Sequence, residues 1–257
     1  MSLEYVDVET AKAARGTRMV TNALVPSPWS EAAKGCFRVA GVPVLVVSRG
    51  MDTAAIDAWT GIDNVPAVIH DRQPVRSSWI AIVTLVDRLA RAAGGPALLP
   101  LDPARRRAAI GVLHEIAGED GIGWNGRLAM IDAAITTNGE RGFPLPVAKF
   151  LAKRYGYSPE AVAIARERIA GQLAFLAGEL SGDYFGGAAP DAIDVYAATF
   201  LTPLAGPITV EECPDMYPMF RNAFTAAFDA FGALVPPALL AHRERMFAQH
   251  LPRPIRL

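Results

Sequence analysis

The hydrophobic pattern changes about a third of the way along the chain. Before residue 94, three short apolar runs are typical of strands: residues 19–25 (MVTNALV), 42–49 (VPVLVVSR) and 65–70 (VPAVIH). Between the first two, "SEAAKGCFRVAG" predicts a short helix that has Ser30 as its N-cap and ends at Gly41. Residues 77–94 predict a longer helix, because their apolar side chains recur every three or four positions.

From about residue 103 the strand pattern disappears. Successive helical segments follow, separated by Gly and Pro: "PARRRAAIGVLHEIAGE", "NGRLAMIDAAITT", "PVAKFLAKRYG", "SPEAVAIARERIAGQLAFLAGEL", "DAIDVYAATFLTPLA", "YPMFRNAFTAAFDAFGALV" and "PPALLAHRERMFAQH". "GGPALLPLDP" is the predicted linker. Such a change of period indicates two domains, an α/β domain over residues 17–93 and an all-α domain over residues 103–257.

Composition narrows the class of protein. Half of the 257 residues are hydrophobic (51%) and the net charge is −1, so we expect a folded protein with no general attraction to nucleic acid or to anionic membranes. The only dense basic run, residues 105–107, is interpreted as a solvated helix face. No apolar run approaches the ~18 residues of a membrane span, and the polar first residues predict no secretory signal.

Cysteine and histidine usage argues for a cytoplasmic protein without a metal. The two cysteines, Cys36 and Cys213, are far apart and form no CxxC pair, which points to a reducing compartment. None of the four histidines has a partner at metal-ligand spacing, so no metal site is expected. Cys36 falls about two turns into a predicted helix, where a small core residue is the simpler interpretation.

The segment "GIGWNG" (residues 121–126) matches the glycine pattern of dinucleotide-binding loops. Such a loop must directly follow a strand, whereas the preceding "AIGVLHEIAGE" has a helical pattern. A bend between two helices is therefore the preferred interpretation, and no nucleotide cofactor is expected. Trp124 and Asn125 at this bend could still face a pocket.

Ser27 stands between a predicted strand and a predicted helix, in "VPSPWS". A turn residue before Pro28, an accessory N-cap and an active hydroxyl are all compatible with that position. The chain offers no Ser-His-Asp grouping, and no G-x-S-x-G elbow surrounds Ser27, so a serine hydrolase is poorly supported.

The order of these signals resembles the glutathione S-transferase superfamily. A strand runs into Ser-Pro-Trp-Ser and a helix, a second strand follows, Val65-Pro66 opens a third strand, and Ser77-Ser78 precedes another helix. The helical second half resembles the C-terminal domain of that superfamily, and "DAIDVYAAT" resembles its capping motif, with Asp191 as N-cap and Asp194 reaching back. The resemblance implies a thioredoxin-like N-terminal domain followed by an all-helical domain.

The resemblance also assigns expected roles. Ser27 falls on the position of the catalytic Ser or Cys. Trp29 and Ser30, which follow it at the start of the helix, are expected to bind glutathione, together with Ser77. Val65 and Pro66 match the cis-proline pair that contacts the cysteinyl part of glutathione, and Ser78 matches the serine that holds the γ-glutamyl carboxylate. The electrophile is expected between the domains, with Trp124, Met130 and the region of Phe143 as candidate walls.

The sequence departs from the family pattern at Ser77, where an acidic residue is usual. Lys34 and Arg38 are candidates for contacts to the carboxylates of glutathione. The resemblance thus implies a homodimeric, cytoplasmic enzyme of detoxification type that uses glutathione against a small hydrophobic electrophile, by conjugation or isomerisation. The alternative is a non-catalytic binding or interaction protein with the same fold. A dinucleotide-dependent oxidoreductase would require a strand before Gly121.

Overall fold

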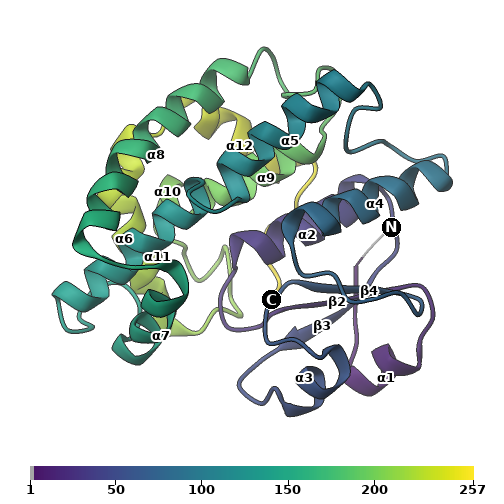
Figure 1. The fold of residues 1–257 in the computed structure, drawn as a ribbon, viewed down its shortest axis with the longest axis horizontal. Helices are drawn as coiled ribbons and strands as arrows, with labels where there is room; N and C mark the ends of the chain where they lie inside the picture. Colours follow the sequence, from purple (N-terminus) through teal and green to yellow (C-terminus); the bar gives the residue numbers. More distant parts are fainter. Residues whose placement is uncertain (1–2) are drawn as a thin grey trace.

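The computed structural model describes residues 3–257 and contains an α/β domain followed by a helical domain (Figure 1). The strands are β1 (Glu4–Tyr5), β2 (Thr17–Asn22), β3 (Leu45–Arg49) and β4 (Ala67–His70). The helices of the α/β domain are α1 (Val8–Ala13), α2 (Pro28–Val39), α3 (Ala54–Thr60) and α4 (Trp79–Ala92). The helical domain contains α5 (Pro103–Ala117), α6 (Ile122–Thr136), α7 (Leu145–Tyr155), α8 (Pro159–Glu179), α9 (Ala192–Phe200), α10 (Thr202–Ala205), η1 (Pro218–Phe220), α11 (Arg221–Phe231), η2 (Gly232–Leu234) and α12 (Pro237–Gln249).

The sheet has the order β1-β3-β2-β4, with β4 antiparallel to β2 and the other pairs parallel. Its side chains alternate between two hydrophobic cores, as successive strand residues must. Met19, Val46 and Val68 point into the core shared with α2 and α4. Val20, Val47 and Ala67 point to the opposite face, which α1 and α3 cover (Figure 1). Apolar side chains on both faces explain why these strands read as continuous apolar runs rather than as alternating ones.

Strand β2 is shorter at its C-terminal end than the predicted strand 19–25. It ends at Asn22, whose side-chain Oδ1 accepts hydrogen bonds from the amides of Leu24 (2.8 Å) and Val25 (3.2 Å). This local turn ends the sheet pairing before the apolar run ends. Two elements before residue 17, β1 and α1, were not predicted because each is too short to show a period; β1 pairs with Leu45 and Val46 of β3.

The central helix α9 begins with the predicted capping box. Asp191 Oδ1 accepts from the amides of Ile193 (2.7 Å) and Asp194 (3.4 Å), and Asp194 Oδ2 accepts from the amide of Asp191 (2.9 Å). The Asp194 side chain is fully buried and also receives hydrogen bonds from the amide of Phe185 and from His242 Nε2. This prediction is confirmed.

Two other local predictions agree with the structure. Arg105 and Arg107 are exposed on α5, and Arg106 reaches Asp87 at 3.5 Å, so the basic run lies on a helix surface. The Cys36 side chain is fully buried, and burial raises the pKa of its thiol far above the ordinary value. Within residues 3–257, no helix combines the length and apolar character that a bilayer crossing requires.

The two domains meet where α2 packs against α9. Gly35 lies in this contact, and a Cβ added there would lie 2.6 Å from Val195 Cγ1 and 2.9 Å from Leu251 Cδ2. We expect Gly35→Ala to lower the free energy of unfolding by up to about 2 kcal/mol, because overpacking of about 1–3 kcal/mol outweighs the helix-propensity gain of about 1 kcal/mol.

Gly171 in α8 is the matched control, because it is exposed and a Cβ there would meet no atom within 4 Å. Gly171→Ala is expected to stabilise the protein by up to about 1 kcal/mol. Urea denaturation of both variants would contradict this account of the domain contact if the two substitutions changed stability in the same direction.

Candidate active site between the two domains

A cleft of about 330 Å³ lies between the α/β domain and the helical domain. Seven of the residues singled out in the sequence line it: Ser27, Trp29, Val65, Pro66, Ser77, Ser78 and Trp124. They come from the start of α2, the start of β4, the start of α4 and the first turn of α6. The fold therefore brings together positions that are up to about a hundred residues apart in the sequence.

Ser27 occupies the N-cap position of α2, where its carbonyl accepts from the amide of Glu31 at 2.9 Å. Its side-chain oxygen does not cap the helix, and the residue is half-buried in the wall of the cleft. Pro28 follows at the first helical position, where a missing N–H costs no hydrogen bond. The hydroxyl is therefore available to a ligand beside the positive end of a 12-residue helix.

Ser30 does not have the predicted position. Ser27, not Ser30, is the N-cap of α2, because the helix already begins at Pro28. The Ser30 side chain is fully buried, and its Oγ lies 3.5 Å from the amide of Asn22 at the end of β2. Ser30 is absent from the described lining of the cleft, so of the two serines only Ser27 can face a ligand there.

Trp29 joins the two domains beside Ser27. Its indole Nε1 donates a hydrogen bond to the carbonyl of Ala117 at the end of α5 (3.0 Å), and its ring packs edge-on against Phe200 with centroids 4.9 Å apart. The side chain is partly exposed along the cleft. The start of α2 is thus held in a fixed position relative to the helical wall.

The α/β side of the cleft contains the Val65-Pro66 pair and the start of α4. The Val65-Pro66 bond is cis, as the resemblance implied, and the following residue, Ala67, pairs with Val20 of β2. Ser78 is the N-cap of α4, with its Oγ accepting from the amide of Ala81 at 3.4 Å. Ser78 is exposed and Ser77 is half-buried, so both are accessible from the cleft.

Met130, predicted as a wall of the electrophile site, is buried and does not line the main cleft. It is only 4% exposed and lines a separate small cavity of about 20 Å³, which Ser27, Trp29 and Phe200 also line. Trp124, by contrast, is half-buried in the main cleft and packs against Tyr155 with ring centroids 4.5 Å apart. Asn125 at the same bend is buried and donates to Asp120 O and Gln172 Oε1, which makes it a structural residue.

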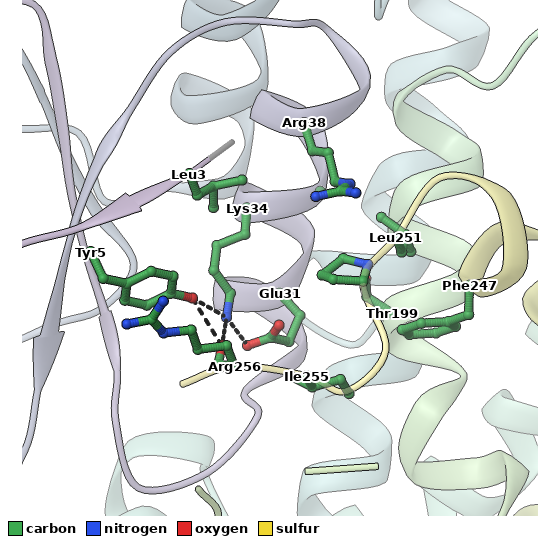
Figure 2. A pocket seen from close by; sticks show the side chains of 12 residues that line it. Leu3, Tyr5, Glu31, Lys34, Arg38, Thr199, Phe247, Leu251, Ile255 and Arg256 are labelled. Carbon is green, nitrogen blue, oxygen red and sulfur yellow. Dashed lines mark hydrogen bonds and ion pairs between the residues drawn. The ribbon is translucent and has the colours of Figure 1, made fainter. Parts of the chain in front are cut away.

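Lys34 and Arg38 do not line the cleft, but line another cavity of the described chain beside the C-terminal segment (Figure 2). Lys34 Nζ lies 2.8 Å from Glu31 Oε1 and donates to the carbonyl of Arg256 at 2.6 Å. Arg38 Nε donates to the carbonyl of His250. Both side chains therefore connect α2 to the segment that follows α12, and neither is placed to contact a ligand beside Ser27.

Several lining residues were missed by the sequence analysis. Asn64, Trp79, Glu119, Arg127, Arg154 and Tyr155 also face the cleft. Arg127 could have been found from helical spacing, since it follows Trp124 by three residues and so shares its face of α6. The others lie at loop or helix ends, whose direction only the fold determines.

The structure also describes the two other candidate features of the sequence, the glycine pattern at residues 121–126 and the Cys and His side chains. Gly121 follows α5 and a short turn, so the strand that a dinucleotide loop requires is replaced by a helix. Residues 3–257 contain no cluster of three His, Cys, Asp or Glu side chains suited to a metal ion. Burial raises the pKa of the Cys213 thiol to about 11, which leaves it protonated at neutral pH.

The structure resembles many solved glutathione transferases. A glutathione S-transferase domain-containing protein from Marinobacter aquaeolei is 16% identical and superposes with a TM-score of 0.57 over 90% of this chain and 98% of that one. The beta-etherase LigF from Sphingobium is 17% identical, with a TM-score of 0.55 over 90% and 99% of the two chains. The chain has the glutathione transferase fold.

A third neighbour was solved with a ligand. It is the glutathione S-transferase from Methylobacterium radiotolerans in complex with glutathione sulfonate, at 19% identity and a TM-score of 0.52 over 92% and 95% of the two chains. No protein-family model and no curated protein matches the sequence. The superpositions cover about nine-tenths of the chain. They confirm the predicted fold class, a thioredoxin-like N-terminal domain followed by an all-helical C-terminal domain.

Proposed function

We propose that the protein is a glutathione transferase-like enzyme that binds glutathione in the interdomain cleft and activates its thiolate for attack on a small electrophile. The supporting observation is the convergence of the Ser27 hydroxyl, the cis Val65-Pro66 pair and the Ser78 N-cap on one cleft. Two neighbours of the same fold, from Methylobacterium radiotolerans and from rice, were solved with glutathione sulfonate and with glutathione.

In this proposal the sulfur of glutathione lies between Ser27 and Val65. The backbone of Val65 binds the cysteinyl part, and Ser77 and Ser78 bind the γ-glutamyl carboxylate at the start of α4. That position suits an anion, because the first amides of a helix lack intrahelical partners and the dipole is positive there. Trp29 forms the wall beside the sulfur, and Trp124 bounds the electrophile on the helical side.

The chemical task is to ionise a thiol whose pKa in solution is about 8.5. A hydrogen bond from the Ser27 hydroxyl to the sulfur stabilises the thiolate more than the thiol, because bonds to a charged acceptor are stronger. Lowering the thiol pKa by one unit requires about 1.4 kcal/mol, which one charge-assisted hydrogen bond can supply. A serine at this position cannot form a mixed disulfide with glutathione, which favours transfer or isomerisation over disulfide reduction.

Replacing Ser27 tests the proposal. Ser27→Ala is expected to bind glutathione within about threefold of the wild type, and to conjugate it to 1-chloro-2,4-dinitrobenzene roughly 10²–10³-fold more slowly, because one donor to developing or full negative charge is lost. The apparent pKa of kcat/KM should move up towards the free thiol value. Ser181→Ala, an exposed loop position, is the control.

Isothermal titration calorimetry and steady-state kinetics would separate the alternatives. Equal turnover by wild type and Ser27→Ala would remove the catalytic role of Ser27. Glutathione binding without turnover by the wild type would favour the non-catalytic binding protein, an alternative motivated by Ser77 at the usually acidic position. Absence of glutathione binding would refute the proposal. We also propose that the enzyme is a homodimer and acts in the cytoplasm. Analytical ultracentrifugation would test the oligomeric state.

A further inference from the structure

Arg127 lies on the helical wall of the cleft, enclosed by aromatic rings. Its guanidinium carbon is 5.2 Å from the ring centroid of Phe143, 5.7 Å from Trp29 and 5.9 Å from Tyr155. The residue is half-buried, so part of the guanidinium faces the cleft. Stacking against ring faces holds the side chain in place while leaving its N–H donors free for a ligand.

No acidic side chain of residues 3–257 forms an ion pair with Arg127. Asp132, the acidic residue of the same helix, accepts a hydrogen bond from Tyr157 (3.0 Å) and lies 3.5 Å from Arg166. Arg154 and Glu119 are the other charged residues of the cleft, and both are exposed at its rim. The cleft therefore carries an excess positive charge, and its most buried charge is Arg127.

The position of Arg127 separates it from the proposed glutathione contacts. Arg127, Ser27 and Trp29 line both the main cleft and the small cavity that contains Met130. Val65, Pro66, Ser77 and Ser78 line only the main cleft among the described residues. Arg127 thus lies with Trp124 on α6, in the helical wall of the cleft, whereas Val65, Pro66, Ser77 and Ser78 belong to the α/β domain. The helical wall is the side on which the proposed function places the electrophile.

We propose that Arg127 selects electrophiles that carry a carboxylate, and that the natural substrate is an aromatic or conjugated acid rather than a neutral hydrophobic compound. This inference rests on the proposed function. The guanidinium binds the carboxylate through paired N–H donors, the geometry for which arginine is suited. Trp29, Trp124 and Tyr155 supply ring faces for a planar substrate.

A matched pair of probes makes the inference testable: 4-chloro-3,5-dinitrobenzoate and its neutral methyl ester. In both, the glutathione thiolate attacks the carbon that bears chlorine, a C–S bond forms, and chloride leaves with the electron pair of the broken C–Cl bond. The thiol proton passes to solvent when the thiolate forms. The two probes differ in the group para to the reacting carbon, which is a charged carboxylate in one and a neutral ester in the other. Their different intrinsic reactivity cancels when wild type and variant are compared on the same probe.

We expect Arg127→Gln to lower kcat/KM for the acid roughly 10- to 100-fold, the range of a hydrogen-bonded charge pair, and to change kcat/KM for the ester by less than threefold. The KM for glutathione should stay unchanged. The kcat/KM of Arg127→Lys for the acid should fall between those of the wild type and Arg127→Gln, because lysine retains the charge but not the planar guanidinium. Arg107→Gln on the exposed surface of α5 is the control.

Binding supplies a readout that does not depend on turnover. The nitroaromatic acid 3,5-dinitrobenzoate has no leaving group and should quench the fluorescence of Trp29, Trp79 and Trp124, which all line the cleft. Its affinity should exceed that of its methyl ester in the wild type but not in Arg127→Gln.

These experiments distinguish a failure of the proposed glutathione-dependent function from a failure of the inference about Arg127. If neither chloro compound is conjugated and glutathione does not bind, the proposed function fails, while preferential binding of 3,5-dinitrobenzoate would still support the role of Arg127. If Arg127→Gln leaves the ratio of acid to ester unchanged in turnover and in binding, the inference is wrong. A raised KM for glutathione with an unchanged ratio would assign Arg127 to glutathione and would equally overturn the inference.

Discussion

Asp194→Ala is expected to lower the free energy of unfolding by about 3–5 kcal/mol, one of the two largest effects that we predict. The carboxylate is fully buried and accepts from the amides of Phe185 and Asp191 and from His242 Nε2 at 2.8 Å. Alanine removes the acceptor for all three donors and ends the capping box at α9. Removing one partner of a buried polar or ionic pair typically costs about this much.

Most of the lost stability should come from the imidazole of His242, which would remain buried without a hydrogen-bond partner. This ring is fully buried, and its Nδ1 has no hydrogen-bond partner among residues 3–257, so Asp194 supplies its single polar contact. Asp194→Asn keeps one acceptor oxygen, which can still accept from the Phe185 amide and His242 but not from the Asp191 amide, which donates to the other oxygen. It should therefore lose less than alanine, about 1–3 kcal/mol. Thermal unfolding should place the midpoint of the alanine variant roughly 6–20 °C below that of the wild type. A loss of less than 1 kcal/mol for Asp194→Ala would contradict this account of α9.

Lys34→Met is expected to have an effect of similar size, with a strong dependence on pH. Burial raises the pKa of the Glu31 carboxyl, and the neighbouring Lys34 charge opposes that rise (Figure 2). Because the folded pKa lies above the unfolded value, Glu31 favours folding below about pH 4.3, and this contribution is lost as the pH rises through the folded pKa. Without the Lys34 charge, the pKa of Glu31 in the folded protein rises further. The stability lost on ionising Glu31 then becomes larger, and the loss extends to higher pH.

We therefore expect Lys34→Met to lower the free energy of unfolding by about 3–5 kcal/mol at pH 8 and by clearly less at pH 5. Tyr5 also donates to the carbonyl of Arg256, at 3.0 Å in the wild type, so we expect the variant to keep this backbone contact of the C-terminal segment. Urea denaturation at both pH values is the measurement. A double variant, Glu31→Gln with Lys34→Met, removes both charges and should recover most of the loss at pH 8. An equal loss at both pH values would show that packing, not charge, decides the effect.

The predicted elements were most accurate where local chemistry decides structure. The period of apolar residues located α4 and the long helices of the second domain. The box formed by Asp191 and Asp194 was visible in four consecutive residues, because its hydrogen bonds involve only neighbouring groups. The main errors arose where local signals compete. Ser30 and Ser27 are both acceptable N-caps in sequence, and the helix starts after Ser27 because Pro28 suits the first helical position.

Only part of the candidate site could be predicted from the sequence. Ser27, Val65, Pro66 and Ser78 each begin an element, and such positions can be matched to a family pattern without a structure. Lys34 and Arg38 could not be placed, because a helix has one face towards the cleft and another towards the C-terminal segment, and the sequence does not show which partner covers which face.

By itself, the sequence determined the two-domain order of elements, the position of α4 and the capping box of α9, because these depend on periodicity and on hydrogen bonds within a few residues. Only the tertiary structure decided that Ser30 is buried, that Lys34 pairs with Glu31 behind α2, and that Arg127 stands among aromatic rings beside Ser27. Those features arise from contacts between segments far apart along the chain, and the packing of α2 against α9 fixes which side chains meet.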